Sequence, residues 1–311
     1  MDRSFTRRDF IRTGGGVIAA ASLGVVEGVG RRAAMADVQT VPAKKRSIRK
    51  AIKLGMVAGE LTLLEKFTLV KDLGFDGIEP DSPNNLDPDE LITARDATGL
   101  VIHGVVDSVH WRDTLSHPDS EVRARGLRGL ETALRDAQLY GASTVLLVPA
   151  VVNEHVSYAD AYTRSQAEIR KILPLAEELG IKIAIENVWN NFLLSPLEAA
   201  RYVDELESPN VGWYFDVGNI VNYGWPEQWV RILGKRILKL DIKEFSRSKR
   251  NDEGLWKGFS VELLEGDCNW PEVMKALDEI GYDGWATAEV GGGGAERLAD
   301  IAERMDRIFA L

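Results

Sequence analysis

Short runs of β-branched and other apolar residues alternate along the chain with segments whose apolar residues recur every three or four positions. The runs are typical of buried strands, and the segments between them are typical of amphipathic helices, as where Leu127, Leu130 and Leu134 share one helical face. The pattern predicts eight strands, at Ile52–Val57, Gly77–Pro80, Val101–Val106, Thr144–Val148, Lys182–Asn187, Gly212–Val217, Ile237–Ile242 and Trp285–Val290.

Capping residues mark the same alternation. Ser195, Pro196 and Glu198 combine an N-cap serine, a proline at the first helical position and a glutamate that completes a capping box. Pro226 and Pro271 are expected to open two further helices. A glycine follows most helical segments, as expected where the chain turns left-handed past a helix C-terminus. These glycines are Gly74, Gly99, Gly141, Gly180, Gly234 and Gly281.

Strand–helix alternation implies parallel strands joined by helical crossovers. Eight such units in about 260 residues fit a closed (β/α)8 TIM barrel better than an open doubly wound sheet. An open sheet that binds a dinucleotide would carry G-x-G-x-x-G after its first strand, where this chain has Ala58-Gly59-Glu60. The 311 residues are 45% hydrophobic and 28% charged, which suffices for one large core. We therefore expect one barrel domain over residues 51–311.

The first residues of the chain have the features of an export signal. Arg7-Arg8 form a pair that is followed by Phe10, and a weakly hydrophobic run with several glycines extends over Val17–Val29. Ala34-Met35-Ala36 then provides an A-x-A cleavage site. The run is too short for a membrane span, which needs about 20 apolar residues.

These features predict a twin-arginine signal over residues 1–36 and a solvated linker over residues 37–50. The mature protein would be exported by the Tat pathway to the periplasm or secreted, without an integral membrane span. An uncleaved anchor or a chance basic end is the alternative interpretation.

Charge and cysteine content exclude several classes of partner and site. The formal net charge is −10, and the first 36 residues contribute +3 through six arginines and three acidic residues, which leaves −13 on the body. An acidic body argues against a nucleic-acid partner, which calls for clustered lysine and arginine, and weakly against highly charged phosphorylated substrates. The single cysteine, Cys268, can form neither an intrachain disulfide nor a thiolate metal cluster.

Carboxylates gather where the predicted strands end, which is the edge at which a TIM barrel builds its active site. Inward carboxylates that converge on one mouth repel each other unless a cation lies between them. A divalent metal with oxygen ligands is the simplest resolution, whereas solvated strand ends or local salt bridges are the alternative. The fifth to eighth predicted strands each place an acid directly after an apolar residue: Ile185-Glu186, Phe215-Asp216, Leu240-Asp241 and Ala288-Glu289.

These strand ends and the segment before the last strand resemble one known family. The chain is similar here to the sugar phosphate isomerase/epimerase superfamily, the xylose-isomerase-like TIM barrels that include ketose 3-epimerases and hydroxypyruvate isomerases. The resemblance extends over roughly residues 50–311 and is more specific for the fold and the metal site than for the substrate. The motifs that carry it are Ile185-Glu186-Asn187, Phe215-Asp216-Val217-Gly218-Asn219, Asp241-Ile242-Lys243-Glu244, Glu265-Gly266-Asp267-Cys268-Asn269-Trp270, Gly281-Tyr282-Asp283-Gly284-Trp285 and Ala288-Glu289-Val290.

The resemblance implies that Glu186, Asp216 and Glu289 are metal ligands. The family's fourth ligand is usually a histidine, and this chain has Asp241 in its place. A further histidine that family members often carry is replaced by Asn219. A site of four carboxylates should prefer hard Mn²⁺, Mg²⁺ or Ca²⁺ over zinc. One divalent ion is therefore expected, with Mn²⁺ the best fit and Mg²⁺ or Co²⁺ as alternatives, and Asp241 could also stand outside the ligand shell.

Other residues at the strand ends are candidates for substrate contact. They are Glu79, His103, His110, Asn219 and Lys243. Both histidines could instead be structural. Three tryptophans that follow strands, Trp111, Trp189 and Trp225, could stack on a sugar face or pack in the core.

The expected activity is that of a metal-dependent sugar isomerase or epimerase that acts through an enediolate on an unphosphorylated ketose or related sugar. Glu186 and Glu289 would serve as base and acid on opposite sides of this small carbohydrate. The first alternative is a lyase or hydrolase-type cleavage of keto-glycosides on the same metal site, and the second is a non-catalytic sugar-binding accessory subunit. Apurinic endonucleases share the barrel, but they need many histidines, and this chain has four. A homo-oligomer is compatible with the sequence.

Overall fold

A computed structural model describes residues 46–311 of the chain. The expected twin-arginine signal over residues 1–36, and residues 37–45 of the expected linker, lie outside the described residues, so both assignments stay predictions. Within the described part, no helix is both long enough and apolar enough to cross a bilayer.

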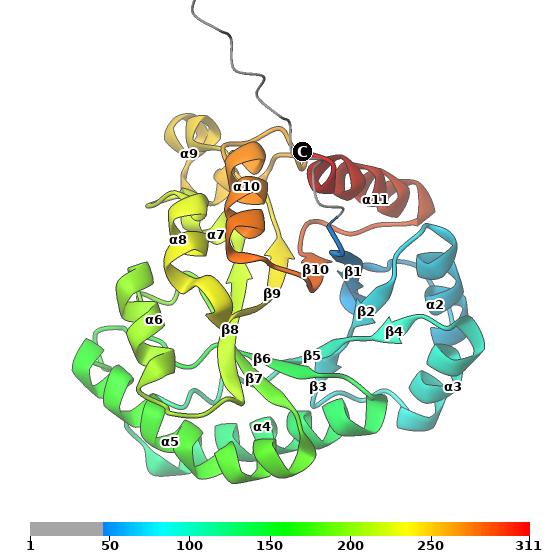
Figure 1. Cartoon of the computed structure of the whole chain (residues 1–311). Coiled ribbons are helices and arrows are strands. Elements are labelled where there is room, and N and C mark those ends of the chain that lie inside the picture. The colour runs from blue at the N-terminus through cyan, green and yellow to red at the C-terminus, as the bar shows by residue number, and fades with distance from the viewer. Residues whose placement is uncertain (1–45) are drawn as a thin grey trace, which may run out of the picture. The chain divides into compact units, whose positions relative to one another are not determined.

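Parallel strands form a closed ring at the centre of the described residues, with helices around it (Figure 1). Pro80, which lacks an N–H group, separates β2 from β3, and His103 separates β4 from β5. Because β2 pairs with β4 and β3 pairs with β5, these four segments are two interrupted strands, and the ring closes between them. The strand segments are β1 (Arg49–Lys53), β2 (Gly77–Glu79), β3 (Asp81–Ser82), β4 (Val101–Ile102), β5 (Gly104–Asp107), β6 (Thr144–Leu147), β7 (Lys182–Glu186), β8 (Val211–Asp216), β9 (Ile237–Ile242) and β10 (Trp285–Ala288). The predicted (β/α)8 barrel is confirmed.

Helices follow the strands, and the longer ones bury apolar residues against the outside of the ring. They are α2 (Leu63–Asp72), α3 (Pro88–Thr98), α4 (Ser120–Tyr140), α5 (Tyr158–Leu179), α6 (Pro196–Asp204), α7 (Val217–Val221), α8 (Pro226–Leu233), α9 (Arg247–Glu253), α10 (Trp270–Ile280) and α11 (Ala295–Phe309), with 3-10 helices η1 (Leu54–Met56), η2 (Gly234–Arg236) and η3 (Leu255–Phe259). Gly141 and Gly180 end α4 and α5 in the left-handed conformation, as predicted. Ser195 caps α6, but the Glu198 carboxylate accepts from Leu194 N rather than completing a capping box.

The first strand begins three residues earlier than predicted and ends four residues earlier. Arg49 and Lys50, which the sequence analysis placed in a solvated linker, belong to β1. The Arg49 guanidinium lies 4.2 Å from the ring centre of Trp285, and Lys50 Nζ is 2.7 Å from Asp306 on α11. The predicted linker therefore stops at the barrel's first strand, and Leu54–Met56 form η1 instead of continuing that strand.

Candidate metal centre

Four neighbouring strands bring four carboxylates together at the carboxyl-terminal edge of the barrel. Glu186 and Asp216 end β7 and β8, Asp241 lies near the end of β9, and Glu289 directly follows β10. One oxygen from each residue lies within 4.8 Å of the others. Hard divalent cations bind oxygen at about 2.0–2.6 Å, so ligands on opposite sides of an ion are about 4–5 Å apart. The spread of the four oxygens therefore fits one shared cation.

The cluster contains carboxylate oxygens that the protein itself leaves without a hydrogen bond. Asp216 and Asp241 are fully buried, and Glu186 is 7% exposed. Asp216 Oδ2, Asp241 Oδ1 and Glu289 Oε2 are buried and have no hydrogen-bond partner among the described residues. An unsatisfied buried acceptor costs about 1–3 kcal/mol or more when charged. Three such atoms in one small volume fit ligation of a cation.

Two lysines border the cluster on opposite sides. Lys243 Nζ lies 2.9 Å from Asp216 Oδ2 and 3.3 Å from Glu289 Oε1. Lys53 Nζ lies 3.1 Å from Asp241 Oδ1 and 2.6 Å from Glu79 Oε2. The contacts to Asp216 Oδ2 and Asp241 Oδ1 are ionic contacts without hydrogen-bond geometry, because neither oxygen accepts a hydrogen bond. Lys53 is shared with Glu79, so the two lysines leave an excess of negative charge on the four carboxylates, which a divalent ion would offset.

The environment separates the proton affinities of the carboxylates. Burial, followed by repulsion from Glu289, raises the pKa of Glu186 well above its ordinary value. Burial also raises the pKa of Asp241, and it raises the pKa of Asp216 to about 6. Burial alone would raise the pKa of Glu289 too, but Lys243 and Lys53 lower it to about 2. Without a cation, Glu289 is thus the most acidic of the four groups.

We expect metal to stabilise the protein more at neutral than at acidic pH. The folded pKa of Asp216 is about 6, above its unfolded value, so the metal-free fold loses stability as pH rises through the window between the two values. A cation needs the ionised carboxylates and relieves that loss. Thermal unfolding with Mn²⁺ or with a chelator, at about pH 5 and about pH 7.5, should show a larger metal-induced rise in Tm at the higher pH. An equal rise at both values would contradict this assignment.

Asparagine side chains hold the two central ligand strands in place. Asn187 Oδ1 accepts from Asp216 N at 3.1 Å, and Asn187 Nδ2 donates to Asp216 O at 2.7 Å. Asp216 Oδ1 caps α7 by accepting from Asn219 N at 2.8 Å. The Asn219 amide donates to Asn187 O and accepts from Lys243 Nζ at 3.4 Å. Asn219 thus supports Asp216 and Lys243 while lying at the cavity wall.

Glu244 ties the segment before α10 to the end of β9. Its buried carboxylate accepts from Leu264 N at 2.9 Å, Cys268 N at 3.1 Å and Trp270 Nε1 at 2.8 Å. The Cys268 thiol donates to Lys243 O at 3.3 Å. The two motifs that the sequence analysis identified here therefore form one hydrogen-bonded unit behind Lys243.

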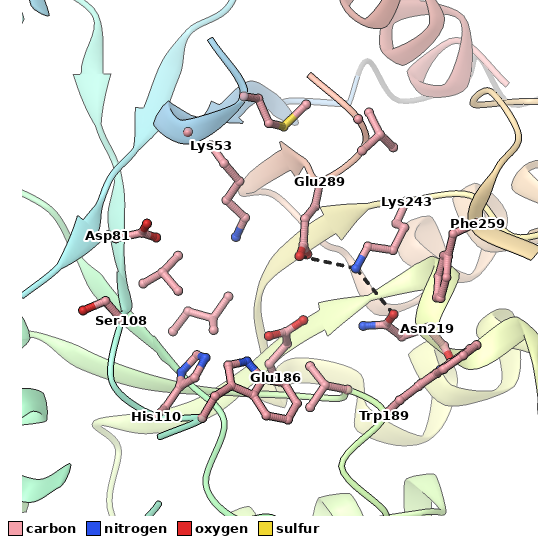
Figure 2. Close-up of a pocket in the computed structure, with 18 of the residues that line it drawn as sticks. Lys53, Asp81, Ser108, His110, Glu186, Trp189, Asn219, Lys243, Phe259 and Glu289 are labelled. Carbon is pink, nitrogen blue, oxygen red and sulfur yellow. Dashed lines mark hydrogen bonds and ion pairs between the residues drawn. The ribbon is translucent and has the colours of Figure 1, made fainter. Parts of the chain in front are cut away.

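A cavity of about 850 Å³ opens above the carboxylates at the same edge of the barrel. Glu186 and Glu289 line it, and their carboxylates point toward one another across its floor (Figure 2). The predicted contact residues His110, Asn219 and Lys243 line the cavity as well. Their substrate contacts remain predictions, although all of them face the space where a substrate would lie.

His110 presents a neutral ring to the cavity. Its Nδ1 accepts a hydrogen bond from Val148 N at 3.2 Å, which leaves the proton on Nε2. Burial, followed by the nearby charge of Lys53, lowers the pKa of His110 to about 3. The ring can therefore donate one hydrogen bond to a sugar oxygen over the whole physiological pH range.

Glu79 and His103 are buried inside the barrel and are not among the residues that line the cavity, so their contact with substrate stays a prediction. The Glu79 carboxylate accepts from Lys53 and, at 3.1–3.2 Å, from the Tyr214 hydroxyl. His103 Nδ1 lies 2.9 Å from Lys239 Nζ. Burial, followed by the charge of Lys239, lowers the pKa of His103 well below its ordinary value. Both residues build the polar interior beneath the metal centre.

Three charged residues that line the cavity, Lys53, Asp81 and Asp107, were not predicted from the sequence. Lys53 ends β1, but the predicted strand ran past it to Val57, so it was not considered as a strand-end residue. Asp107 ends β5 directly after the apolar Val106, which is the same apolar–acid signal that identified the metal cluster. Burial raises the pKa of Asp107 to about 7, so its carboxyl group can donate or accept a hydrogen bond near neutral pH.

Comparison with known proteins places this geometry among related barrels. A family model described as xylose isomerase-like TIM barrel matches residues 67–310. L-ribulose-5-phosphate 3-epimerase UlaE of Escherichia coli (strain SMS-3-5 / SECEC) is 26% identical over 281 residues, which cover 85% of this chain and 96% of that protein. The uncharacterised protein MJ1311 of Methanocaldococcus jannaschii is 28% identical over 177 residues, 55% of this chain and 58% of that protein. The crystal structure of a D-tagatose 3-epimerase-like protein superposes with a TM-score of 0.71 at 22% identity, over 85% of this chain and 97% of that one.

Proposed function

The chain belongs to the xylose isomerase-like TIM barrel family, and on that premise we propose that it is a divalent-metal-dependent sugar isomerase or epimerase. Its substrate in this proposal is an unphosphorylated ketose or a related sugar, and manganese is the preferred ion. Similarity to proteins named as sugar 3-epimerases supports the reaction class.

One observation carries the proposal. Four carboxylates from four adjacent strands converge within 4.8 Å, and three of their buried oxygens lack a hydrogen-bond partner among the described residues. Glu186 and Glu289 belong to this cluster and also line the cavity. A sugar in the cavity would therefore contact both carboxylates and any cation that they hold.

The charges around the cavity favour a substrate without a phosphate group. Lys53 and Lys243 are the lysines that line the cavity in the described part of the chain, and no arginine lines it there. Both lysines are already held by carboxylates at 2.6–3.3 Å. A phosphate would have to compete with those carboxylates for its counter-charge. The substrate of this chain would then differ from the phosphorylated sugar in the name of the E. coli relative.

The chain's own residues would move the proton. A bound divalent ion would supply Lewis acidity that stabilises an enediolate form of the sugar. Glu186 and Glu289 would form the pair that transfers the proton, because both line the cavity and their carboxylates point toward one another across it (Figure 2). One would accept the proton from the sugar carbon, and the other would return a proton. His110 and Lys243 would hold sugar oxygens in place.

Proton exchange in deuterated water tests this proposal. The manganese-loaded protein should incorporate deuterium into a ketose at the carbon next to the carbonyl, and an isomer or epimer should accumulate. Loss of the glycosidic substituent from a keto-glycoside would instead indicate a lyase. If the ketoses and keto-glycosides tested bind but none of them gains deuterium at carbon, the result would contradict an isomerase and favour a binding protein. Mass spectrometry and NMR distinguish these results.

Export by the twin-arginine route is part of the same proposal, since an unphosphorylated sugar is the form found outside the inner membrane. Changing Arg7 and Arg8 to lysine should retain the precursor in the cytoplasm, because the paired arginines define the signal. Fractionation with an antibody against the barrel measures the distribution. Normal export and cleavage of the double variant would contradict the assignment.

A further inference from the structure

Three aromatic rings form a continuous surface along one side of the cavity. We call this the aromatic wall: Trp189, Trp256 and Phe259, all of which line the cavity. The ring centres of Trp189 and Phe259 are 4.8 Å apart, and those of Trp189 and Trp256 are 4.9 Å apart. These distances are those of rings in direct contact. Figure 2 shows Trp189 and Phe259 beside Asn219 and Lys243, opposite Asp81, Ser108 and His110.

The aromatic wall starts at the metal centre. Lys243 Nζ, which contacts two of the cluster carboxylates, lies 5.5 Å from the ring centre of Phe259. Trp189, which packs against Phe259, donates from Nε1 to Asn219 O at 2.9 Å. This hydrogen bond holds the indole ring at the cavity wall. A molecule that reaches the cluster carboxylates therefore has the aromatic wall directly beside it.

The outer end of the wall is exposed to solvent. Trp256 lies on η3 and is 68% exposed, although it packs against Trp189 and Phe259 on one face. Trp189 and Phe259 are only partly buried. A cluster of large apolar groups that faces a cavity and stays exposed is typical of a ligand-binding surface.

The cavity is also larger than the reacting sugar requires. Its volume of about 850 Å³ lies near the upper end of the range of about 300–1,000 Å³ that holds drug-sized ligands. A single hexose is smaller than such ligands. With one sugar ring at the carboxylates, space remains along the aromatic wall for another ring.

We propose that the physiological substrate is a glycoside of two or more rings, with the reacting sugar, which keeps a free carbonyl group, at the carboxylates and a second ring stacked on Trp256 and Trp189. The second ring is joined through a glycosidic oxygen and presents an apolar face, as both aryl groups and sugar rings do. This inference rests on the proposed function for the position of the first ring. It narrows the substrate class from sugars in general to glycosides.

Binding of unreactive probes tests the second-ring site without any need for turnover. The manganese-loaded protein is titrated calorimetrically with methyl glucopyranosides, phenyl glucopyranosides and cellobiose. The parent protein should bind the phenyl glycosides, cellobiose or both about tenfold more tightly than the methyl glycosides. Trp256→Ala should remove this preference while the Kd of the methyl glycosides stays within about twofold. Tighter binding of the phenyl glycosides would identify the second ring as an aryl group, and tighter binding of cellobiose would identify it as a sugar.

Trp225→Ala is the matched control, because Trp225 is 56% exposed but does not line the cavity. It should leave every Kd unchanged. Equal or undetectable binding of methyl and two-ring probes to the parent would overturn the proposal, and so would a preference that survives Trp256→Ala. A change in oligomeric state of Trp256→Ala, seen by light scattering without a change in probe binding, would assign the wall to a contact between copies. Deuterium exchange into simple ketoses is independent of all these outcomes, so the second-ring site and the proposed reaction can fail separately.

Discussion

Glu186→Gln and Glu289→Gln should each lower kcat by at least about a thousandfold. Each residue would provide both a metal-binding oxygen and a group that transfers a proton, and loss of proton transfer alone typically costs about 10²–10⁴ in rate. Both carboxylates belong to the cluster and line the cavity. Deuterium exchange into the substrate, measured with manganese at saturation, reports the loss.

The variant at residue 186 should nevertheless fold. Burial and Glu289 raise the pKa of Glu186, so the fold disfavours its ionised form, and glutamine resembles the neutral form that the metal-free site prefers. Without metal, its Tm should equal or exceed that of the parent. Glu178→Gln, on the exposed side of α5, is the matched control and should retain both activity and metal binding. Near-normal exchange by either active-site variant would remove the proposed acid–base pair.

Asp241→Ala should weaken manganese binding by at least about a hundredfold, the upper end of the loss that follows removal of a group that merely supports a ligand. Asp241 is fully buried, and its Oδ1 has no hydrogen-bond partner in the described part of the chain. The substitution also removes one of the two carboxylates that Lys53 contacts, so the charge of Lys53 is less offset and adds repulsion against a cation. Competition with a chelating dye measures the affinity.

Asp241→His distinguishes two roles of Asp241, that of a metal ligand and that of a counter-ion to Lys53. Imidazole is a softer ligand than carboxylate, so this variant should keep a metal but shift its preference from manganese toward zinc or cobalt. Asp300→Ala, which removes a partly exposed acid that pairs with Arg297 and Arg304, should leave metal affinity unchanged. If Asp241→Ala binds manganese as tightly as the parent, Asp241 serves only to neutralise Lys53, and the site has three carboxylate ligands.

The periodicity of apolar residues was sufficient to predict the barrel because each strand and helix carries its own local pattern. The same periodicity did not predict the surroundings of residues whose contacts lie far away in the sequence. Lys50 reads as a solvated linker residue, but its charge is met by Asp306, 256 positions along the chain. The segment over residues 247–259 is rich in charge, and no specific helix was assigned to it from the sequence, yet it folds into α9 and η3 and supplies part of the aromatic wall.

The acids of the cluster could be predicted because alternation along a strand tells which residues face inward. It does not tell how high an inward residue lies, since that depends on the stagger between strands. Glu79 and His103 both face inward, but the pairing of Glu79 with Lys53 and of His103 with Lys239 keeps them below the cavity. Asp107 carried a usable local signal that was overlooked, whereas Lys53 could be identified only once the end of β1 was known.

The link between Glu244 and Cys268 gives the molecule an intrinsic probe of local opening. Cys268 is the single thiol of the chain, it is fully buried, and its backbone N–H and its sulfur are both bonded to the end of β9 beside Lys243. A thiol reagent can react only when this segment detaches from Glu244, so the modification rate follows the frequency of that detachment. Comparison of this modification rate with and without a divalent cation would show whether metal binding at the carboxylates also stabilises the backbone behind them. The measurement needs no added label.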